Sequence, residues 1–451
     1  MRERLRTAAA LVLACALALG PLHARAQQPL PLDAFYGLLN QNGVAAQASL
    51  ERIRKGWRDD YAAMLLELVG FIPTRTTQIG VLSLLEQASG LPSGGDLDRW
   101  YQWLWSADRG MHPDYAEFKA GLYEQIDPRF REYFANRPKT LIRLDEIRWG
   151  GVWRDGIPPL ENPKMIRARE AAYLADDNIV FGVAIDGDVR AYPKRILAWH
   201  EMVKHTIAGR PLIGVYCTLC GAMILYDVTV DGVHHELGTS GFLYRSNKLM
   251  YDHATKSLWS TLTGAPVVGP LAGKGIELKL LHVVTTTWKE WKRRHPGTLV
   301  LSPDTGHQRD YSEGAAYREY FATDRLMFGV PKLDTRLPNK AEVLGLRSAH
   351  EQLAIAVEFL RANRTWHGRL DDREFVVLTD ASGANRVYEA GNLRFANWDG
   401  EAAVRERSGK TWKVAEDGLT GPGGKKLKRL PAHRSFWFGW YAAYPGTRLV
   451  K

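Results

Sequence analysis

The stretch from Ser257 to Leu301, SLWSTLTGAPVVGPLAGKGIELKLLHVVTTTWKEWKRRHPGTLVL, recurs in degenerate form near the end of the chain. The later stretch, residues 409–450, reads GKTWKVAEDGLTGPGGKKLKRLPAHRSFWFGWYAAYPGTRLV. Both contain Trp, Gly-Pro, Gly-Lys, Leu, Trp-x-x-Trp and Pro-Gly-Thr in the same order, so that Trp259 corresponds to Trp412. Because chance rarely keeps so many uncommon residues in order, we predict an internal repeat.

The alignment extends backwards to a pair of cysteines. VYCTLCGAMILYDVTVDG (215–232) aligns with VVLTDASGANRVYEAGN (376–392), which lacks the thiols. We infer that the first copy keeps a chemical site and that the second serves as scaffold. The Pro- and charge-rich stretch PKLDTRLPNK (331–340) is the predicted joint between them.

The N-terminal third of the chain has a different pattern. SLERIRKGW (49–57) and QIGVLSLLEQASG (78–90) place apolar residues at i, i+3 and i+4, which predicts helices. Asp59 and Asp60 are expected to cap the helix that begins near YAAMLLELV, and Gly90 to end the following one. We therefore predict an all-helical N-terminal domain of short helices.

The rest of the chain has the pattern of strands and hairpins. NIVFGVAIDGDVRAYP (178–193) and MILYDVTVDGVHHELG (223–238) each contain two β-type runs joined by Asp-Gly, which supplies the positive φ angles of a tight hairpin. The predicted fold class is α+β, a helical N-terminal domain followed by a duplicated β-rich module. The predicted boundaries are 1–26 for a signal peptide, 27–150 for the helical domain, 151–330 for the first copy and 331–451 for the degenerate second copy.

The start of the chain predicts export. Arginines precede a short apolar run that ends in Ala24-Arg25-Ala26, a small-x-small cleavage signal, so the mature protein is expected to begin at Gln27. An uncleaved anchor is the alternative, and Cys15 fits a lipoprotein signal poorly. We expect a periplasmic or secreted protein without stable membrane insertion. The net charge of +10 is spread out and no nucleic-acid-binding module is recognised, so a nucleic-acid partner is not expected.

Several motifs resemble one known family. They are AYP (191–193), HEMV (200–203), YCTLCGA (216–222), TSGFLYRS (239–246) and LMYDHATKSLWS (249–260). With the WKEWKRRHPGT segment they resemble the bacterial domain of unknown function 3179. The family usually has Pro after the first Cys and Asn-Asp after the HEMV-like segment, where this chain has Thr218 and Lys204-His205. The resemblance implies no established chemistry.

Cys217 and Cys220, in CTLCG, are the central site candidates. In a metal-binding CxxCG knuckle two thiolates face one ion, and the final glycine takes a left-handed conformation that a Cβ would oppose. Gly221 stands at that position, and the flanking LIGVY and MILYDV predict strands. A thioredoxin-type motif needs a helix N-terminus in a βαβ context instead. A metal site, a structural disulfide and a catalytic or redox-sensing dithiol remain open.

Two thiolates need further donors to complete a metal site. The candidates are His200, Met250 and His253, with Glu201 and Asp252 as nearby carboxylates. Thiolate, imidazole and thioether together favour copper, whereas thiolate and imidazole alone also suit zinc. Each candidate has an ordinary alternative: a helix-end histidine at 200, core packing at 250, a turn cap at 252 and a loop residue at 253.

The first functional hypothesis is an exported metal-binding protein, copper first and zinc second, in periplasmic metal handling or redox chemistry. The second is a non-catalytic scaffold whose CxxC is a structural disulfide and whose helical domain and Trp-rich surfaces bind a protein partner. The third is a metal-dependent enzyme that uses His200 or Glu201 as a base. Whether the protein turns over a substrate stays open.

Overall fold

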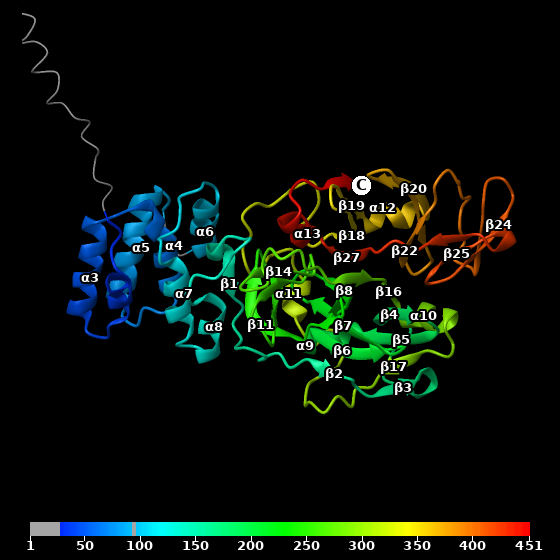
Figure 1. The fold of residues 1–451 in the computed structure, drawn as a ribbon, viewed down its shortest axis with the longest axis horizontal. Coiled ribbons are helices and arrows are strands. Elements are labelled where there is room, and N and C mark those ends of the chain that lie inside the picture. Colours follow the sequence, from blue (N-terminus) through cyan, green and yellow to red (C-terminus); the bar gives the residue numbers. More distant parts are fainter. Residues whose placement is uncertain (1–27, 93–95) are drawn as a thin grey trace, which may run out of the picture. The chain divides into compact units, whose positions relative to one another are not determined.

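The computed structural model describes residues 28–92 and 96–451 (Figure 1). The predicted signal peptide and Cys15 lie outside the described residues. The described chain forms two compact units, one of residues 28–92 with Arg109–Pro113 and the other of residues 96–108 with Asp114–Lys451. Within the described ranges, no helix has the length and apolar character needed to cross a membrane.

The first unit is built from helices. Its α-helices are α2 (Leu32–Tyr36), α3 (Gly43–Lys55), α4 (Ala62–Leu68) and α5 (Arg75–Ser89). The Asn42 side chain caps α3 by accepting from the Val44 and Ala45 amides. The predicted end of α5 at Gly90 is confirmed, because Gly90 takes a left-handed φ of 68°. The predicted Asp cap of α4 is wrong, since a 3₁₀ turn precedes α4 and Asp60 accepts from Arg58.

Three more helices belong to the second unit: α6 (Leu97–Trp105), α7 (Tyr115–Tyr123) and α8 (Arg131–Phe134). They pack against the β-rich part of the chain. Lys119 in α7 donates to the Ile147 carbonyl at 2.7 Å, and the rings of Tyr123 and Phe134 pack on Phe242. These contacts explain why the compact units do not divide at the predicted boundary near residue 150.

The first module, defined here as residues 179–301, contains three sheets, and each gains one strand from outside it. Their orders are β16-β4-β5-β17-β3, β15-β8-β7-β6-β2 and β1-β11-β12-β13-β14. A small ribbon pairs β9 with β10. The bounds are β1 (Ile147–Trp149), β2 (Leu160–Glu161), β3 (Met165–Arg167), β4 (Ile179–Ile185), β5 (Asp188–Pro193), α9 (Lys194–His200), β6 (Met202–Ile207), β7 (Arg210–Cys217), β8 (Ala222–Asp227), β9 (Thr229–Val230), β10 (Val233–His234), β11 (Leu237–Tyr244), β12 (Asn247–Asp252), β13 (Leu258–Ser260), β14 (Ala265–Val268), β15 (Lys279–Leu281), β16 (Val284–Thr287), α10 (Trp288–Arg294) and β17 (Leu299–Leu301).

The second module, defined as residues 342–450, also contains three sheets, drawn from yellow to red in Figure 1. Their orders are β27-β18-β19-β28, β20-β21-β22 and β23-β24-β25-β26. A short helix, α11 (Arg318–Phe321), lies in the segment between the modules. The bounds are β18 (Glu342–Arg347), β19 (Gln352–Ala356), α12 (Val357–Ala362), β20 (Thr365–Leu370), β21 (Arg373–Thr379), β22 (Asn385–Glu389), β23 (Ala403–Arg405), β24 (Thr411–Val414), β25 (Gly418–Thr420), β26 (Lys426–Lys428), β27 (His433–Phe436), α13 (Trp437–Ala443) and β28 (Arg448–Val450).

Both predicted Asp-Gly hairpins are confirmed. β4 and β5 pair antiparallel around Asp186-Gly187, whose φ angles are 47° and 86°. β9 and β10 pair around Asp231-Gly232, at 49° and 80°. Two successive positive φ angles define the type I′ turn that matches the twist of the flanking strands. With helices and many sheets, the fold is α+β, as predicted.

Candidate functional site

The two cysteines lie in the turn between β7 and β8. Cys217 ends β7 and pairs with Ala222, the first residue of β8. Gly221 has the predicted left-handed conformation, with φ 61°. The cysteines form a disulfide, and their Cα atoms are 5.3 Å apart, within the usual range for such a bond. The CxxC therefore closes a hairpin turn and does not begin a helix.

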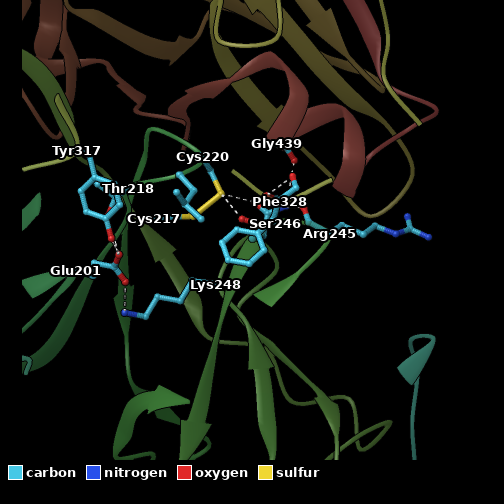
Figure 2. Close-up of a disulfide and its surroundings, with 12 residues drawn as sticks. Glu201, Cys217, Thr218, Cys220, Arg245, Ser246, Lys248, Tyr317, Phe328 and Gly439 are labelled. Carbon is cyan, nitrogen blue, oxygen red and sulfur yellow. Dashed lines mark hydrogen bonds and ion pairs between the residues drawn. A yellow bond between two sulfur atoms is a disulfide. The ribbon is translucent and has the colours of Figure 1, made fainter. Parts of the chain in front are cut away.

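The disulfide is buried. Cys217 is 2% exposed and Cys220 is fully buried. The Cys220 sulfur lies 2.9 Å from the Asn247 side-chain oxygen and 3.4 Å from the Ser246 carbonyl, at the start of β12 (Figure 2). Because both sulfurs are covered by protein, an external thiol cannot reach them without local opening.

The second module covers the turn. The Phe436 amide, at the end of β27, donates to the Cys220 carbonyl at 2.6 Å. Gly439, in α13, lies so close that a Cβ there would stand 3.1 Å from the Cys220 Cβ. A Cβ at Gly221 would meet the Phe436 ring at 2.9 Å, so this glycine is required both by its φ angle and by this close approach. The disulfide thus lies at the contact between the modules.

A buried carboxylate, Glu201, is joined to the same turn. Its side chain accepts from the Thr218 hydroxyl at 2.7 Å, from the Lys248 ammonium at 2.9 Å and from the Tyr317 hydroxyl at 3.3 Å (Figure 2). The side chains of Glu201 and Lys248 are only 11% and 4% exposed. A buried ion pair persists only when further hydrogen bonds satisfy it, and Thr218 and Tyr317 supply them here. Burial raises the pKa of Tyr317, and the Glu201 charge raises it further.

His200 does not point toward the cysteines. One ring nitrogen lies 2.9 Å from the Pro158 carbonyl and the other 2.5 Å from the Tyr311 hydroxyl. Burial lowers the pKa of His200. Glu201, the next residue, has a left-handed φ of 55° that ends α9, and its side chain reaches the turn instead. His200 is therefore the last residue of a helix, which agrees with its ordinary interpretation as a helix-end histidine.

The remaining candidates lie on β12 or directly after it. Met250 is fully buried in the hydrophobic cluster that also holds both cysteines. His253 stacks on Tyr251 with ring centroids 4.8 Å apart. It stands six residues beyond Asn247, which places its backbone on the order of 20 Å along the strand from the residue that contacts the Cys220 sulfur. Asp252 accepts from the Thr255 amide at 2.7 Å, which confirms its interpretation as a turn cap.

The donors predicted for a metal do not converge. Within residues 28–92 and 96–451, no group of three or more His, Cys, Asp or Glu side chains is arranged to hold a metal ion. The cysteines are bonded to each other, and the two histidines bind other groups. With the cysteines bonded to each other, the residues in this conformation do not fit a copper or zinc centre, and the metal site stays a prediction.

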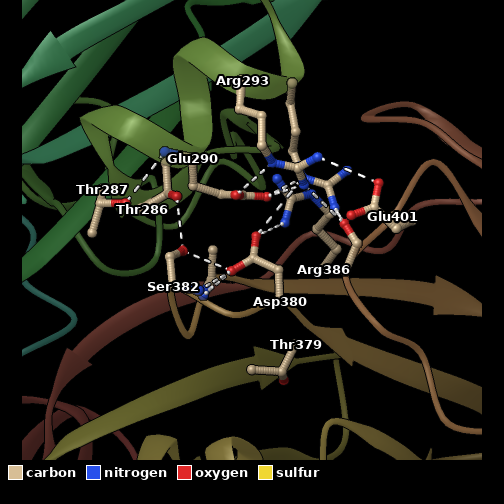
Figure 3. Close-up of polar contacts among 12 residues, drawn as sticks. Thr286, Thr287, Glu290, Arg293, Thr379, Asp380, Ser382, Arg386 and Glu401 are labelled. Carbon is tan, nitrogen blue, oxygen red and sulfur yellow. Dashed lines mark hydrogen bonds and ion pairs between the residues drawn. The ribbon is translucent and has the colours of Figure 1, made fainter. Parts of the chain in front are cut away.

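The corresponding turn of the second module is organised by a carboxylate. When Thr379 and Ser382 are aligned with Cys217 and Cys220, Asp380 falls opposite Thr218. Asp380 accepts from the Ser382 hydroxyl at 2.6 Å and from the Ala384 amide at 3.0 Å (Figure 3). Its other oxygen accepts from Arg386 at 2.8 Å. Side-chain hydrogen bonds of this kind stabilise a turn without a covalent bond. Where the first module has a disulfide, the second has a hydrogen-bonded aspartate.

Three residues that contact the turn or Glu201 were not predicted from the sequence: Lys248, Asn247 and Tyr317. A usable signal existed only for Lys248, because a lysine inside the otherwise buried strand NKLMYD requires a partner. Asn247 and Tyr317 carry no local pattern that separates them from ordinary polar residues. Their contribution depends on which strands and loops meet at the turn.

Comparisons with known proteins identify a family but no activity. No curated protein and no solved structure matches the chain. The family described as "Protein of unknown function (DUF3179)" matches residues 154–447, which include the disulfide turn, Glu201, Lys248 and the second module up to Thr447. The match covers more than half of the sequence and agrees with the resemblance of the motifs around CTLCG, and the chain therefore belongs to the DUF3179 family.

Proposed function

We propose that this protein is a non-catalytic binding scaffold in which the oxidised Cys217–Cys220 turn holds two β-rich modules together. One observation carries the proposal: the disulfide is buried under β27 and α13 of the second module. Thiols that exchange electrons or bind metals need access for a partner thiol or an ion, whereas a structural disulfide does not. Glu201 and Lys248 add a buried ion pair beneath the same turn.

We further propose that the modules are duplicated copies. The sheet β16-β4-β5-β17 and the sheet β27-β18-β19-β28 have the same strand order, each with its final strand parallel to its neighbour. Trp259 and Trp412 lie buried in β13 and β24, the third strand before β16 and β27 respectively. These correspondences support the alignment and a division of roles in which only one copy kept the cysteines.

An exported location is part of the proposal. The N-terminal arginines, the short apolar run and Ala24-Arg25-Ala26 support a cleaved signal peptide and a periplasmic or secreted protein. A disulfide is expected to persist in such a compartment. The helices that precede the modules are the proposed surface for a protein partner.

The double substitution Cys217→Ser with Cys220→Ser is expected to lower the free energy of unfolding by about 2 kcal/mol, because the disulfide closes only a short loop. Denaturant unfolding followed by Trp fluorescence measures the change. Reducing agent should destabilise the native protein by a similar amount and leave the double variant unaffected. Elemental analysis of the native protein should find no stoichiometric copper or zinc. A bound metal together with unchanged stability on reduction would contradict the scaffold.

Copper binding by the reduced protein is the second candidate function. Met250 belongs to the same buried cluster as both cysteines, so its thioether is the predicted donor to test beside the two thiolates of the reduced protein. Soft sulfur ligands favour Cu(I). Met250→Leu keeps the volume and removes the thioether.

If this candidate is right, Met250→Leu in the reduced protein should weaken Cu(I) binding about tenfold in competition with a chromogenic chelator. Met202→Leu is the matched control, because Met202 is equally buried in the same cluster but lies on β6. Equal Cu(I) affinities for the native protein and Met250→Leu would exclude the thioether as a ligand.

A further inference from the structure

A small cavity lies beside the disulfide turn, between the two modules. Its volume is about 90 Å³. Tyr216 and Gly221, which flank the two cysteines, contribute to its wall from the first module, and Ser382 and Arg434 contribute from the second. A water molecule occupies about 30 Å³ of liquid, so the cavity holds a few waters or one small solute. Nucleotides and cofactors need several times this volume.

The charged side chains around the cavity are mostly cationic. Lys194, Arg361 and Arg434 line it, and Glu342 is the one acidic side chain among its lining residues. Glu342 is 41% exposed and lies 3.4 Å from Arg434. Arg361 is paired with Glu358 at 3.3 Å. This leaves the partly solvated Glu342 against Lys194 and Arg434, so the cavity favours an anion.

Lys194 is the cation with the fewest partners. Within the described residues its ammonium makes no hydrogen bond or ion pair, while the centroid of the Phe321 ring lies 4.4 Å away. Burial lowers the pKa of Lys194, against the smaller opposing effects of Glu342 and Glu313. A half-buried lysine in this condition costs folding free energy unless an anion compensates it.

Arg434 is also held mostly by neutral groups. Its guanidinium donates to the Asn385 side-chain oxygen at 2.9 and 3.0 Å and to the Gly383 carbonyl. Burial lowers the pKa of Arg434. Neutral oxygens fix the orientation of the guanidinium, and its ion-pair partner Glu342 is partly exposed at 3.4 Å, so a ligand can share the charge of Arg434.

Hydroxyl groups from both modules complete the wall. Thr286, in β16, and Ser382, in the turn of the second module, lie 3.1 Å apart through their side-chain oxygens (Figure 3). The Ser382 hydroxyl donates its proton to Asp380, so this pair of hydroxyls makes the wall polar and the charged donors are Lys194 and Arg434.

We propose that this cavity is a binding site for a small oxyanion, of the size of sulfate, phosphate or acetate, held by Lys194 and Arg434. The site lies at the contact between the modules, so the anion would join them electrostatically beside the disulfide. The proposal goes beyond the scaffold function and is independent of the redox state of the cysteines.

Isothermal titration calorimetry of the purified native protein tests the site. Sulfate, phosphate and acetate are titrated separately at constant ionic strength, and we expect one equivalent of at least one of them to bind. A preference for sulfate or phosphate indicates a tetrahedral ligand, and a preference for acetate indicates a carboxylate. Lys194→Met should weaken that binding about tenfold or more, since it removes a charge-assisted donor.

Lys289→Met is the matched control, because Lys289 is an exposed lysine near the start of α10 and does not line the cavity. It should bind the anion like the native protein. Lys194→Met should fold, because it removes a poorly compensated charge, and its melting temperature without anion should not fall. Arg361→Gln, at a half-exposed side chain, should cause a smaller loss of affinity.

Two results would overturn the proposal. One is the absence of both heat and thermal stabilisation with all three anions in the native protein. The other is an equal loss of affinity in Lys194→Met and Lys289→Met, which would show binding to the general positive surface. Weaker binding at a pH above the lowered pKa of Lys194, with no such change in Lys194→Met, supports the ammonium as a ligand.

Discussion

Glu416→Gln is expected to lower the free energy of unfolding by about 3–5 kcal/mol. Arg386 is fully buried, and its guanidinium donates to Glu416 at 2.9 Å and to Asp380 at 2.8 Å. Arg429, 4% exposed at its side chain, pairs with the other oxygen of Glu416. Removing this carboxylate leaves two buried arginines with one buried acid between them. Thermal and denaturant unfolding measure the loss.

A double variant separates the cost of an unpaired charge from the value of the pair. Glu416→Leu with Arg429→Met replaces a buried ion pair by apolar side chains, a change that is often close to neutral. It should therefore be more stable than Glu416→Gln. If the double variant is as unstable as the single one, the argument from an uncompensated arginine is wrong.

Glu416 should also make the free energy of unfolding depend on pH in the acid range. Burial alone would raise the pKa of Glu416, but Arg386 and Arg429 outweigh burial and hold it well below the ordinary glutamate value of 4.5. The stabilisation is therefore complete above pH 4.5 and is lost as the pH falls toward the folded-state pKa. Glu416→Gln should lack this part of the acid sensitivity.

Trp440→Ala and Trp291→Ala are each expected to cost about 3–5 kcal/mol. Both indoles are fully buried, and each lies on a strand glycine: Trp291 on Gly182 and Trp440 on Gly345. A Cβ at Gly345 would stand 2.1 Å from the Trp440 ring, so no other residue fits under the indole. Removing either ring leaves a large cavity that the rigid sheet cannot close.

The paired design also tests the duplication. Trp291 donates to the Thr298 hydroxyl at 3.0 Å, and Trp440 donates to the Thr447 hydroxyl at 2.9 Å. Thr298→Val and Thr447→Val should each cost about 1 kcal/mol, because each leaves one indole N–H without its acceptor. Similar losses in both modules are expected for copies of one unit. A large loss in one module and almost none in the other would count against equivalent cores.

Features that depend on neighbouring residues could be predicted from the sequence. Asp186-Gly187 and Asp231-Gly232 form the expected hairpins, and Gly221 has the expected left-handed φ. The predicted Asp cap of α4 was wrong for a local reason as well, because Asp59 and Asp60 belong to a 3₁₀ turn that precedes α4. Turn chemistry acts over a few residues, and so a short window of sequence is enough to find it.

The surroundings of the cysteines could not be predicted in this way. His200 was the favoured ligand from the sequence. The left-handed conformation of Glu201 ends α9, however, and the side chain that contacts Thr218 is the Glu201 carboxylate and not the His200 imidazole. Lys248 reaches the same carboxylate from a strand 47 residues away in the sequence. Phe436 arrives from the second module. None of these long-range contacts produces a periodic pattern in the sequence.

The amino-acid sequence by itself determined the strands, the hairpin turns and the CxxC turn, because hydrophobic periodicity and Asp-Gly or Gly conformations act locally. Only the tertiary structure decided that the two cysteines are buried under the second module and that Lys194 and Arg434 face one cavity. Burial and charge balance are sums over residues that are distant in the chain. They take their values only when the sheets have packed and water has been excluded.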